Sequence, residues 1–375
     1  MRANDFIQVL CDHIHGRKTN IIISSDLLKA AKSHQVEGIV YAQTKNSALQ
    51  EAYYAAVYLD SQRRFFYQEI QSILSSKNIP FFSVKGLTVA DFYPIPALRT
   101  MGDIDIITEY REDVKKILVA NGYLFKGEEL NEWHFFKQGI EFELHNHLMY
   151  KQNLATEKQA LYFDKCWNYI TAGRLDWNYH FLFLMAHLRK HLLVGIGFRS
   201  FMDIAVLIKN GGYLFDWEWI QKELNELDLF RFTQICFGLI QRWFEVEPPF
   251  TIPHLDEENV RIATAEIFEN GIFGINIVNP EIRQGFDVYK SSERGYYCIL
   301  LNRFIQKAFP KYEIMILFPE YKFLKGRKYI LPFFWLFRFL RNVFNPIKWK
   351  KLKREISISR ESLNNRKEQL RRWGL

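Results

Sequence analysis

The run Asp103-Ile104-Asp105-Ile106 constrains the fold of this chain more than any other segment does. Side chains alternate between the two faces of a β-strand, so a strand over residues 103–108 places the isoleucines on one face and the aspartates on the other. Two carboxylates this close repel each other unless a cation neutralises them. Mg²⁺ is suited to that role because it prefers oxygen ligands. The run therefore predicts a strand with an apolar face in the core and a divalent-metal site on the opposite face.

A second alternating segment, residues 140–147, is also predicted to be a strand. Its polar face carries Glu141, Glu143, His145 and His147. Glu143 is the candidate third acid and metal ligand beside Asp103 and Asp105. Glu141 is the alternative, because the register between the strands decides which of the two acids is adjacent. Three carboxylates can hold two divalent ions about 4 Å apart, which is the arrangement that supports an in-line phosphoryl displacement.

The turn Lys85-Gly86 separates a predicted strand, residues 79–84, from a predicted short helix, residues 87–93. A glycine lets the backbone approach a ligand closely, and the free N–H groups at the start of a helix favour phosphate. Lys85 adds a positive charge, with an ordinary surface lysine as the alternative. Arg99 is a second candidate phosphate ligand, and the alternative is that it pairs with a nearby carboxylate.

The order of the predicted elements indicates an α+β fold. Residues 1–76 have apolar positions at helical spacing, and residues 77–150 form an α/β core of about four strands and two helices. Residues 151–310 are again predicted to be helical, and residues 311–375 form a basic, aromatic tail. The fold class is therefore a small mixed β-sheet core with flanking N- and C-terminal helical regions.

The positive charge is concentrated in the tail. The whole chain has a net charge of +8, whereas residues 301–375 alone contain 19 Lys/Arg and 5 Asp/Glu, so the preceding part is net acidic. The tail has three interpretations: a helix packed on the core with a solvated basic extension, an interfacial helix on an anionic membrane, or a nucleic-acid surface.

The spacing of the cysteines and the length of the apolar runs indicate the cellular compartment of the protein. The four cysteines are far apart and form no CxxC pair, which favours neither a zinc ribbon nor a disulfide framework and fits a reducing cytoplasm. The N-terminus lacks the apolar run of a signal peptide, and no stretch of about 18 uncharged apolar residues occurs. We therefore expect a cytoplasmic protein, with peripheral contact at the inner membrane surface as the alternative.

These motifs together resemble the nucleotidyltransferase superfamily related to DNA polymerase beta. That pattern is a strand, a glycine turn and a short helix, then a strand with two alternating aspartates and a later acidic strand. The fuller string is similar to one bacterial branch, the uncharacterised nucleotidyltransferase family, and consists of Lys85-Gly86, Pro96-Ala97-Leu98-Arg99-Thr100-Met101-Gly102-Asp103-Ile104-Asp105, Asn121-Gly122-Tyr123 and Glu143-Leu144-His145. The resemblance covers residues of about 50 to 330.

The resemblance implies metal-dependent transfer of a nucleoside monophosphate from an NTP to an acceptor hydroxyl, with release of pyrophosphate. The expected cofactor is Mg²⁺ or Mn²⁺, and the expected NTP is ATP. The acceptor stays open among a small molecule, a sugar, a protein hydroxyl and an RNA end. One rival hypothesis is a non-catalytic binding protein of the same fold that docks on membrane or RNA through its tail. Another is a transferase that attaches AMP to a partner protein.

The resemblance extends into the helical part at His187, His191, Arg199 and Asp203. Residues four apart lie on one face of a helix, so each pair is expected to line the nucleotide or acceptor side of the cleft. His187 and Arg199 are accordingly candidate nucleotide-binding residues. For Arg199 and Asp203 the alternative is a structural ion pair.

Overall fold

The computed structural model describes residues 2–129, 132–151, 154–171, 173–192, 195–272, 305, 309–315, 319–336 and 367–375. The chain divides into two compact units, residues 1–277 with 373–375 and residues 278–372. Every residue of the candidate site lies in the first unit.

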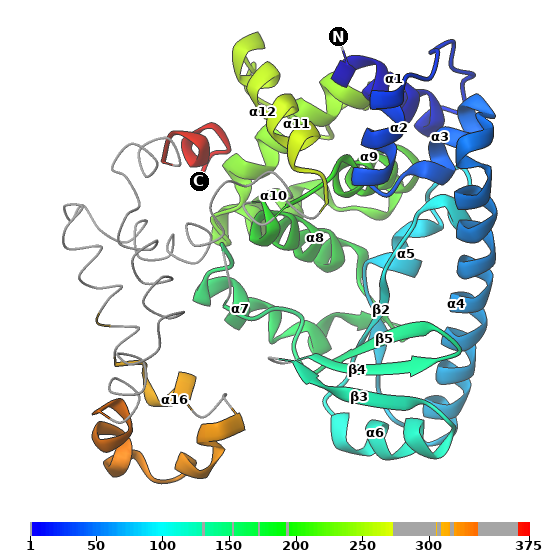
Figure 1. Ribbon diagram of the computed structural model, residues 1–375. Helices are drawn as coiled ribbons and strands as arrows, with labels where there is room; N and C mark the ends of the chain where they lie inside the picture. Colours follow the sequence, from blue (N-terminus) through cyan, green and yellow to red (C-terminus); the bar gives the residue numbers. More distant parts are fainter. Residues whose placement is uncertain are drawn as a thin grey trace. The chain divides into compact units, whose positions relative to one another are not determined.

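A five-stranded mixed sheet forms the β part of the first unit (Figure 1). In chain order its strands are β1 (Phe82–Ser83), β2 (Asp103–Ile107), β3 (Leu124–Glu129), β4 (Glu132–Lys137) and β5 (Ile140–His145). The spatial order is β1-β2-β5-β4-β3. β2 and β5 are parallel, and the other neighbouring strands are antiparallel. The predicted α+β class with a small mixed sheet is confirmed, and the two acidic strands are direct neighbours.

The sheet differs from the prediction at its two edges. β3 was not expected, because its sequence is largely polar and contains Gly127, at which the register against β4 shifts. Leu124, its first residue, is exposed, as is common on an edge strand. At the other edge, β1 is only two residues long, shorter than the expected strand over residues 79–84.

Helices on one side of the sheet complete its core. The long helix α4 (Gln50–Ser76) runs alongside the sheet, and α6 (Arg111–Ala120) is the second of the two helices expected in the core (Figure 1). The cluster they form with the apolar faces of the strands includes Phe66, Ile70, Leu74, Ile104, Ile106, Val114, Leu118, Phe142 and Leu144. Burying this face leaves the alternate side chains of β2 and β5 pointing the other way.

Helices precede and follow the sheet, as predicted. Before it lie α1 (Arg2–Ile14), α2 (Ser25–Ser33), α3 (Glu37–Thr44) and η1 (Ser47–Leu49). The Ser24 hydroxyl caps the start of α2 by accepting from Leu27 N at 3.2 Å. Within the sheet region, α5 (Gly86–Ala90) and η2 (Pro96–Leu98) lie between β1 and β2. α5 ends three residues before the predicted helix does.

The elements after the sheet are α7 (Glu157–Phe163), η3 (Cys166–Tyr169), β6 (Ile170–Thr171), β7 (Arg174–Leu175), α8 (Trp177–His191), α9 (Phe198–Gly211), η4 (Gly212–Leu214), α10 (Trp217–Glu226), α11 (Phe230–Phe244) and α12 (Glu257–Asn270). The two-residue strands β6 and β7 pair with each other and were not predicted. α8 starts at a cap that its sequence encodes, because Asp176 accepts hydrogen bonds from the first backbone N–H groups.

The second unit has a small core of its own. Its described elements include α16 (Tyr312–Met315), η5 (Pro319–Leu324) and η6 (Lys328–Ile330). Met315, Tyr321, Leu324 and Leu331 are buried against one another. Residues 337–366 of the basic, aromatic tail lie outside the described residues. Within the part of the chain that is described, no helix is long and apolar enough to span a membrane.

Candidate active site

β2 directs its two aspartates away from the hydrophobic core. Ile104 and Ile106 are buried in the core cluster, and Asp103 and Asp105 alternate with them along the strand. Asp105 is only 4% exposed, so its carboxylate is desolvated and needs a charged partner. The predicted strand with one apolar and one acidic face is confirmed.

The parallel neighbour β5 brings a third carboxylate to the aspartates. The register places Glu143 beside Asp105 and Glu141 beside Asp103. Glu141 is engaged elsewhere, because its Oε1 lies 2.9 Å from His134 Nδ1 on β4. Glu143 lies beside Asp105, and its charge contributes to the raised pKa of Asp103. Of the two acids left open by the sequence, Glu143 is therefore the one that joins both aspartates.

The three carboxylates perturb one another's ionisation. Burial, followed by the charges of Asp105 and Glu143, raises the pKa of Asp103 to about 7. Burial acts in the same direction on Asp105, but Lys85 and His145 outweigh it and hold the pKa of Asp105 well below its usual range. This cluster thus concentrates negative charge that a divalent cation would neutralise.

Lys85 reaches the aspartates from the strand-to-helix turn. Its Nζ lies 2.6 Å from Asp105 Oδ1, and the pair is largely buried, which rules out an ordinary surface lysine. The backbone of Lys85 has φ 57° and ψ −121°, a conformation that non-glycine residues rarely adopt. Its N–H donates to Nε2 of His180 on α8, at 3.1 Å. The turn is therefore held in an unfavourable conformation with the lysine side chain aimed at β2.

Gly86 has a packing role in the same turn. A Cβ at this position would lie 2.9 Å from the sulfur of Met101, and the backbone φ of Gly86 is not in the left-handed region. Gly86 and Met101 are both buried and both line the same cavity. The glycine consequently allows the turn to lie against the segment that leads into β2.

Arg99 is engaged in a buried ion pair. Its Nη2 lies 2.6 Å from Oδ2 of Asp203 on α9, and its Nε donates to Oδ1 at 3.1 Å. The Tyr93 hydroxyl donates to the same Oδ1 at 2.7 Å. The alternative that Arg99 pairs with a carboxylate is therefore the arrangement that the structure contains, and a direct phosphate contact would require the pair to open.

Arg199 does not form the ion pair with Asp203 that its spacing suggested. Its Nη1 donates instead to Gln35 Oε1 at 2.9 Å and to Thr100 Oγ1 at 3.0 Å. That alternative was wrong because Arg99, which is remote in sequence, takes Asp203. Burial and the nearby Arg99 charge lower the pKa of Arg199 to about 10. Arg199 still lines the cavity, as predicted for a ligand-binding residue.

The carboxylates open onto a cavity of about 490 Å³. Its lining includes the three acids, Lys85, Gly86, Arg99, Arg199 and one face of α8 with Phe183, Leu184, His187, Leu188 and His191. The rings of His187 and His191 lie 4.4 Å apart. Burial and the charge of Lys85 lower the pKa of His187 well below its usual range, and burial with Lys190 lowers that of His191 to about 3. α8 thus offers apolar side chains and neutral imidazoles to a cavity with an acidic strand edge, and Lys190 of the same helix also lines the cavity.

Two residues of the site were underestimated from the sequence. His180 was not singled out, although His180, His187 and His191 recur at helical spacing and so mark one face of α8. The sequence places His145 on the polar face of its strand without assigning it a role, and in the structure its Nε2 lies 3.3 Å from Asp105 Oδ1 and 3.4 Å from Glu143 Oε2. Burial lowers the pKa of His145, but these two carboxylates outweigh it and raise the pKa to about 9.

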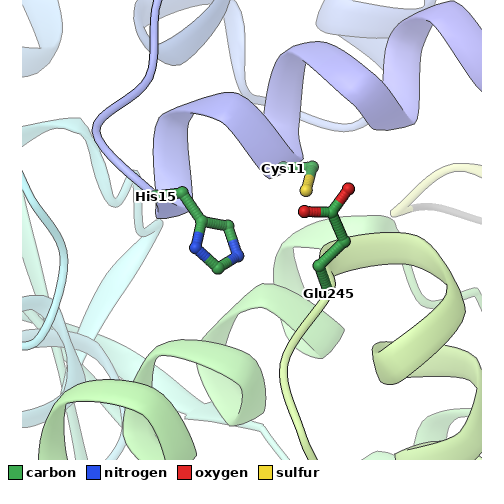
Figure 2. A group of neighbouring side chains, drawn as sticks. All are labelled: Cys11, His15 and Glu245. Carbon is green, nitrogen blue, oxygen red and sulfur yellow. The ribbon is translucent and has the colours of Figure 1, made fainter.

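A second cluster with metal-ligating side chains does not line this cavity. Cys11 and His15 come from the C-terminal end of α1 and face Glu245 at the end of α11 (Figure 2). A cation already lies there, because Arg17 Nη2 is 2.8 Å from Glu245 Oε2 and 3.2 Å from Cys11 Sγ. His15 Nε2 is paired with the Phe244 carbonyl at 2.7 Å. These contacts assign the cluster a structural role between α1 and α11.

Comparison with protein families assigns the chain to a family. A model of the family described as "Uncharacterised nucleotidyltransferase" matches residues 24–245, which is more than half of the chain and includes β1 to β5, α8 and α9. No curated protein and no solved structure matches.

Proposed function

The chain belongs to the uncharacterised nucleotidyltransferase family, and from this premise we propose that it transfers a nucleoside monophosphate from an NTP, with ATP as the first candidate, to an acceptor hydroxyl. The acceptor oxygen attacks the α-phosphorus, the bond from the α-phosphorus to the bridging oxygen breaks, and pyrophosphate leaves. The observation that carries the proposal is the convergence of Asp103, Asp105 and Glu143 from two parallel strands at one cavity wall.

The donor set fits divalent metal ions. Asp103, Asp105 and Glu143 offer oxygen ligands at close range, and burial, followed by the charges of the other two acids, raises the pKa of Asp103. Mg²⁺ or Mn²⁺ bound there would neutralise the phosphates and activate the acceptor oxygen. One of the carboxylates would accept the proton of the acceptor hydroxyl.

The remaining residues of the cavity would position the nucleotide. Lys85 lies beside the acids and carries a positive charge suited to the β- and γ-phosphates. The α8 wall of His187, His191 and Phe183 offers ring faces and apolar surface, which suit a nucleobase. Arg199 adds a buried positive charge on the α9 side. Arg99, held by Asp203, would act mainly by orienting the segment before β2.

Thermal unfolding with each of the four NTPs, with and without Mg²⁺ or Mn²⁺, tests the binding half of the proposal. We expect stabilisation that needs both ion and nucleotide. Glu143→Gln should abolish it, because the variant removes one of the three charges that hold the ions. Glu141→Gln is the matched control on the same strand and should retain it, because Glu141 contacts His134 instead. Absence of stabilisation by any NTP in the wild type, or equal loss in both variants, would contradict the proposal and favour the non-catalytic alternative.

A further inference from the structure

His145 occupies a position that the proposed function does not explain. It lies on β5 two residues after Glu143, on the same side of the sheet, and is 7% exposed. Its Nε2 lies within ion-pair distance of Asp105 and Glu143, at 3.3 Å and 3.4 Å, but it has no hydrogen-bond partner of regular geometry among the described residues. A buried polar nitrogen of this kind requires a specific explanation.

The separations match those of atoms that share one metal ion. Donor atoms of Asp105, Glu143 and His145 all lie within 4.8 Å of one another. Two ligands bound at roughly 2.1 Å stand about 3.0 Å apart at a right angle and about 3.4 Å apart at the tetrahedral angle. The distances from His145 Nε2 to Asp105 Oδ1, 3.3 Å, and to Glu143 Oε2, 3.4 Å, fall in this range. Lys85 Nζ lies 2.6 Å from the same Asp105 oxygen, so an ion bound to that oxygen would displace the ammonium.

We propose that His145 is a direct metal ligand, and that its Nε2 with one oxygen each of Asp105 and Glu143 forms a mixed nitrogen–oxygen site. The inference rests on the proposed function and names the class of ion. Mg²⁺ prefers an all-oxygen shell, whereas imidazole favours first-row transition ions. This position therefore selects an ion such as Mn²⁺ or Co²⁺ over Mg²⁺, while Asp103 remains available to a second ion beside Glu143.

The neighbouring strand supplies a matched control. His134 on β4 is also close to Glu143, with its Nδ1 3.7 Å from Glu143 Oε1. That nitrogen is already paired with Glu141 at 2.9 Å. His134 is the alternative ligand, because its Nε2 has no hydrogen-bond partner among the described residues and its donor atoms lie close to those of Glu132 and Glu143. Variants of the two histidines distinguish the two sites.

Pulsed electron paramagnetic resonance of Mn²⁺ bound to the full chain tests the proposal. In wild-type protein with ¹⁵N-labelled histidine, we expect hyperfine coupling between Mn²⁺ and one histidine nitrogen. This result tests for a histidine ligand without any substitution that could affect folding. His145→Gln should abolish the coupling and weaken Mn²⁺ binding by about tenfold or more, as loss of a ligand-shell contact does at comparable sites. Mg²⁺ binding should change less, because glutamine supplies an oxygen. His134→Gln should keep the coupling.

Bound Mn²⁺ without nitrogen coupling in the wild type would overturn the proposal, as would coupling that is lost in His134→Gln and kept in His145→Gln. The variant Asp105→Asn distinguishes an error in the His145 proposal from an error in the proposed nucleotidyltransferase function. If that variant abolishes ion and NTP binding while the wild type shows no nitrogen coupling, His145 is not a ligand and the nucleotidyltransferase site stands. If the wild type binds no divalent ion even with NTP, both proposals fail.

Discussion

At the scale of single residues, the site brings together three carboxylates whose like charges repel one another. Asp103, Asp105 and Glu143 face one cavity, and the raised pKa of Asp103 is the consequence of burial beside the other two acids. Lys85 and His145 offset part of this charge at Asp105. Such local destabilisation is common at functional sites, where the arrangement serves a ligand and not the fold.

Asp103→Asn should therefore stabilise the metal-free protein. The substitution keeps the shape of the side chain and removes one of three like charges, so we expect the free energy of unfolding at neutral pH with EDTA to rise by on the order of 1–2 kcal/mol. Urea unfolding measures this. Glu141→Gln should give no gain, because it weakens the contact that the Glu141 carboxylate makes with His134. A variant less stable than the wild type would show that Asp103 makes net favourable contacts.

At the scale of elements, the α9 helix is tied to the segment before β2. Asp203 on α9 accepts from Arg99 and from Tyr93, and Arg199 on the same helix donates to Thr100. The pair of Arg99 and Asp203 is buried on both sides. Breaking a buried pair costs more than replacing both partners, because the remaining charge is left without compensation.

Asp203→Asn should destabilise the protein by about 3–5 kcal/mol, since it leaves the buried Arg99 guanidinium without its counter-charge. The double variant Arg99→Met/Asp203→Asn should be more stable than Asp203→Asn alone. The exposed pair of Lys116 and Asp113 provides a comparison, and Asp113→Asn should change stability by less than about 1 kcal/mol. Equal effects of the Asp203 and Asp113 variants in urea unfolding would contradict the buried-pair argument.

The elements also show how far the sequence predicts this fold. α6 and the acidic faces of β2 and β5 follow from local periodicity, so they could be predicted. The choice of Glu143 over Glu141 depends on strand register, and the pairing of Arg99 with Asp203 joins residues 104 positions apart. The link from His180 to the Lys85 backbone spans 95 positions. Such contacts are set by tertiary packing, which periodicity in one segment does not encode.

At the scale of the whole molecule, buried histidines should control the response to acid. Burial, assisted at some positions by nearby positive charge, lowers the pKa of His13, His34, His180, His187 and His191. A histidine whose pKa is lower in the folded state stabilises the fold fully above its unfolded pKa of about 6.5, and that contribution is lost as the pH falls toward the folded value.

The free energy of unfolding should therefore fall steeply between pH 6.5 and pH 4. His34 tests this, because its pKa is lowered to about 4 and its ring joins α2 to Phe198 N and the Phe268 carbonyl. His34→Asn should be less stable at pH 7.5 but should lose on the order of 2 kcal/mol less than the wild type over this range. Urea unfolding at a series of pH values measures how the free energy of unfolding changes with pH in the wild type and in His34→Asn. The same change in both proteins would contradict a lowered pKa of His34.

Transfer of label from NTP tests the central claim most directly. Wild-type protein is incubated with α-³²P-labelled or γ-³²P-labelled NTP, Mg²⁺ or Mn²⁺, and cell extract, and the products are separated into protein, RNA and small molecules. We predict that α-label, and not γ-label, enters one of these fractions, that pyrophosphate is released, that Glu143→Gln abolishes transfer, and that Glu141→Gln retains it. Transfer of γ-label, or α-label incorporation unchanged in Glu143→Gln, would contradict nucleotidyl transfer at the site formed by Asp103, Asp105 and Glu143.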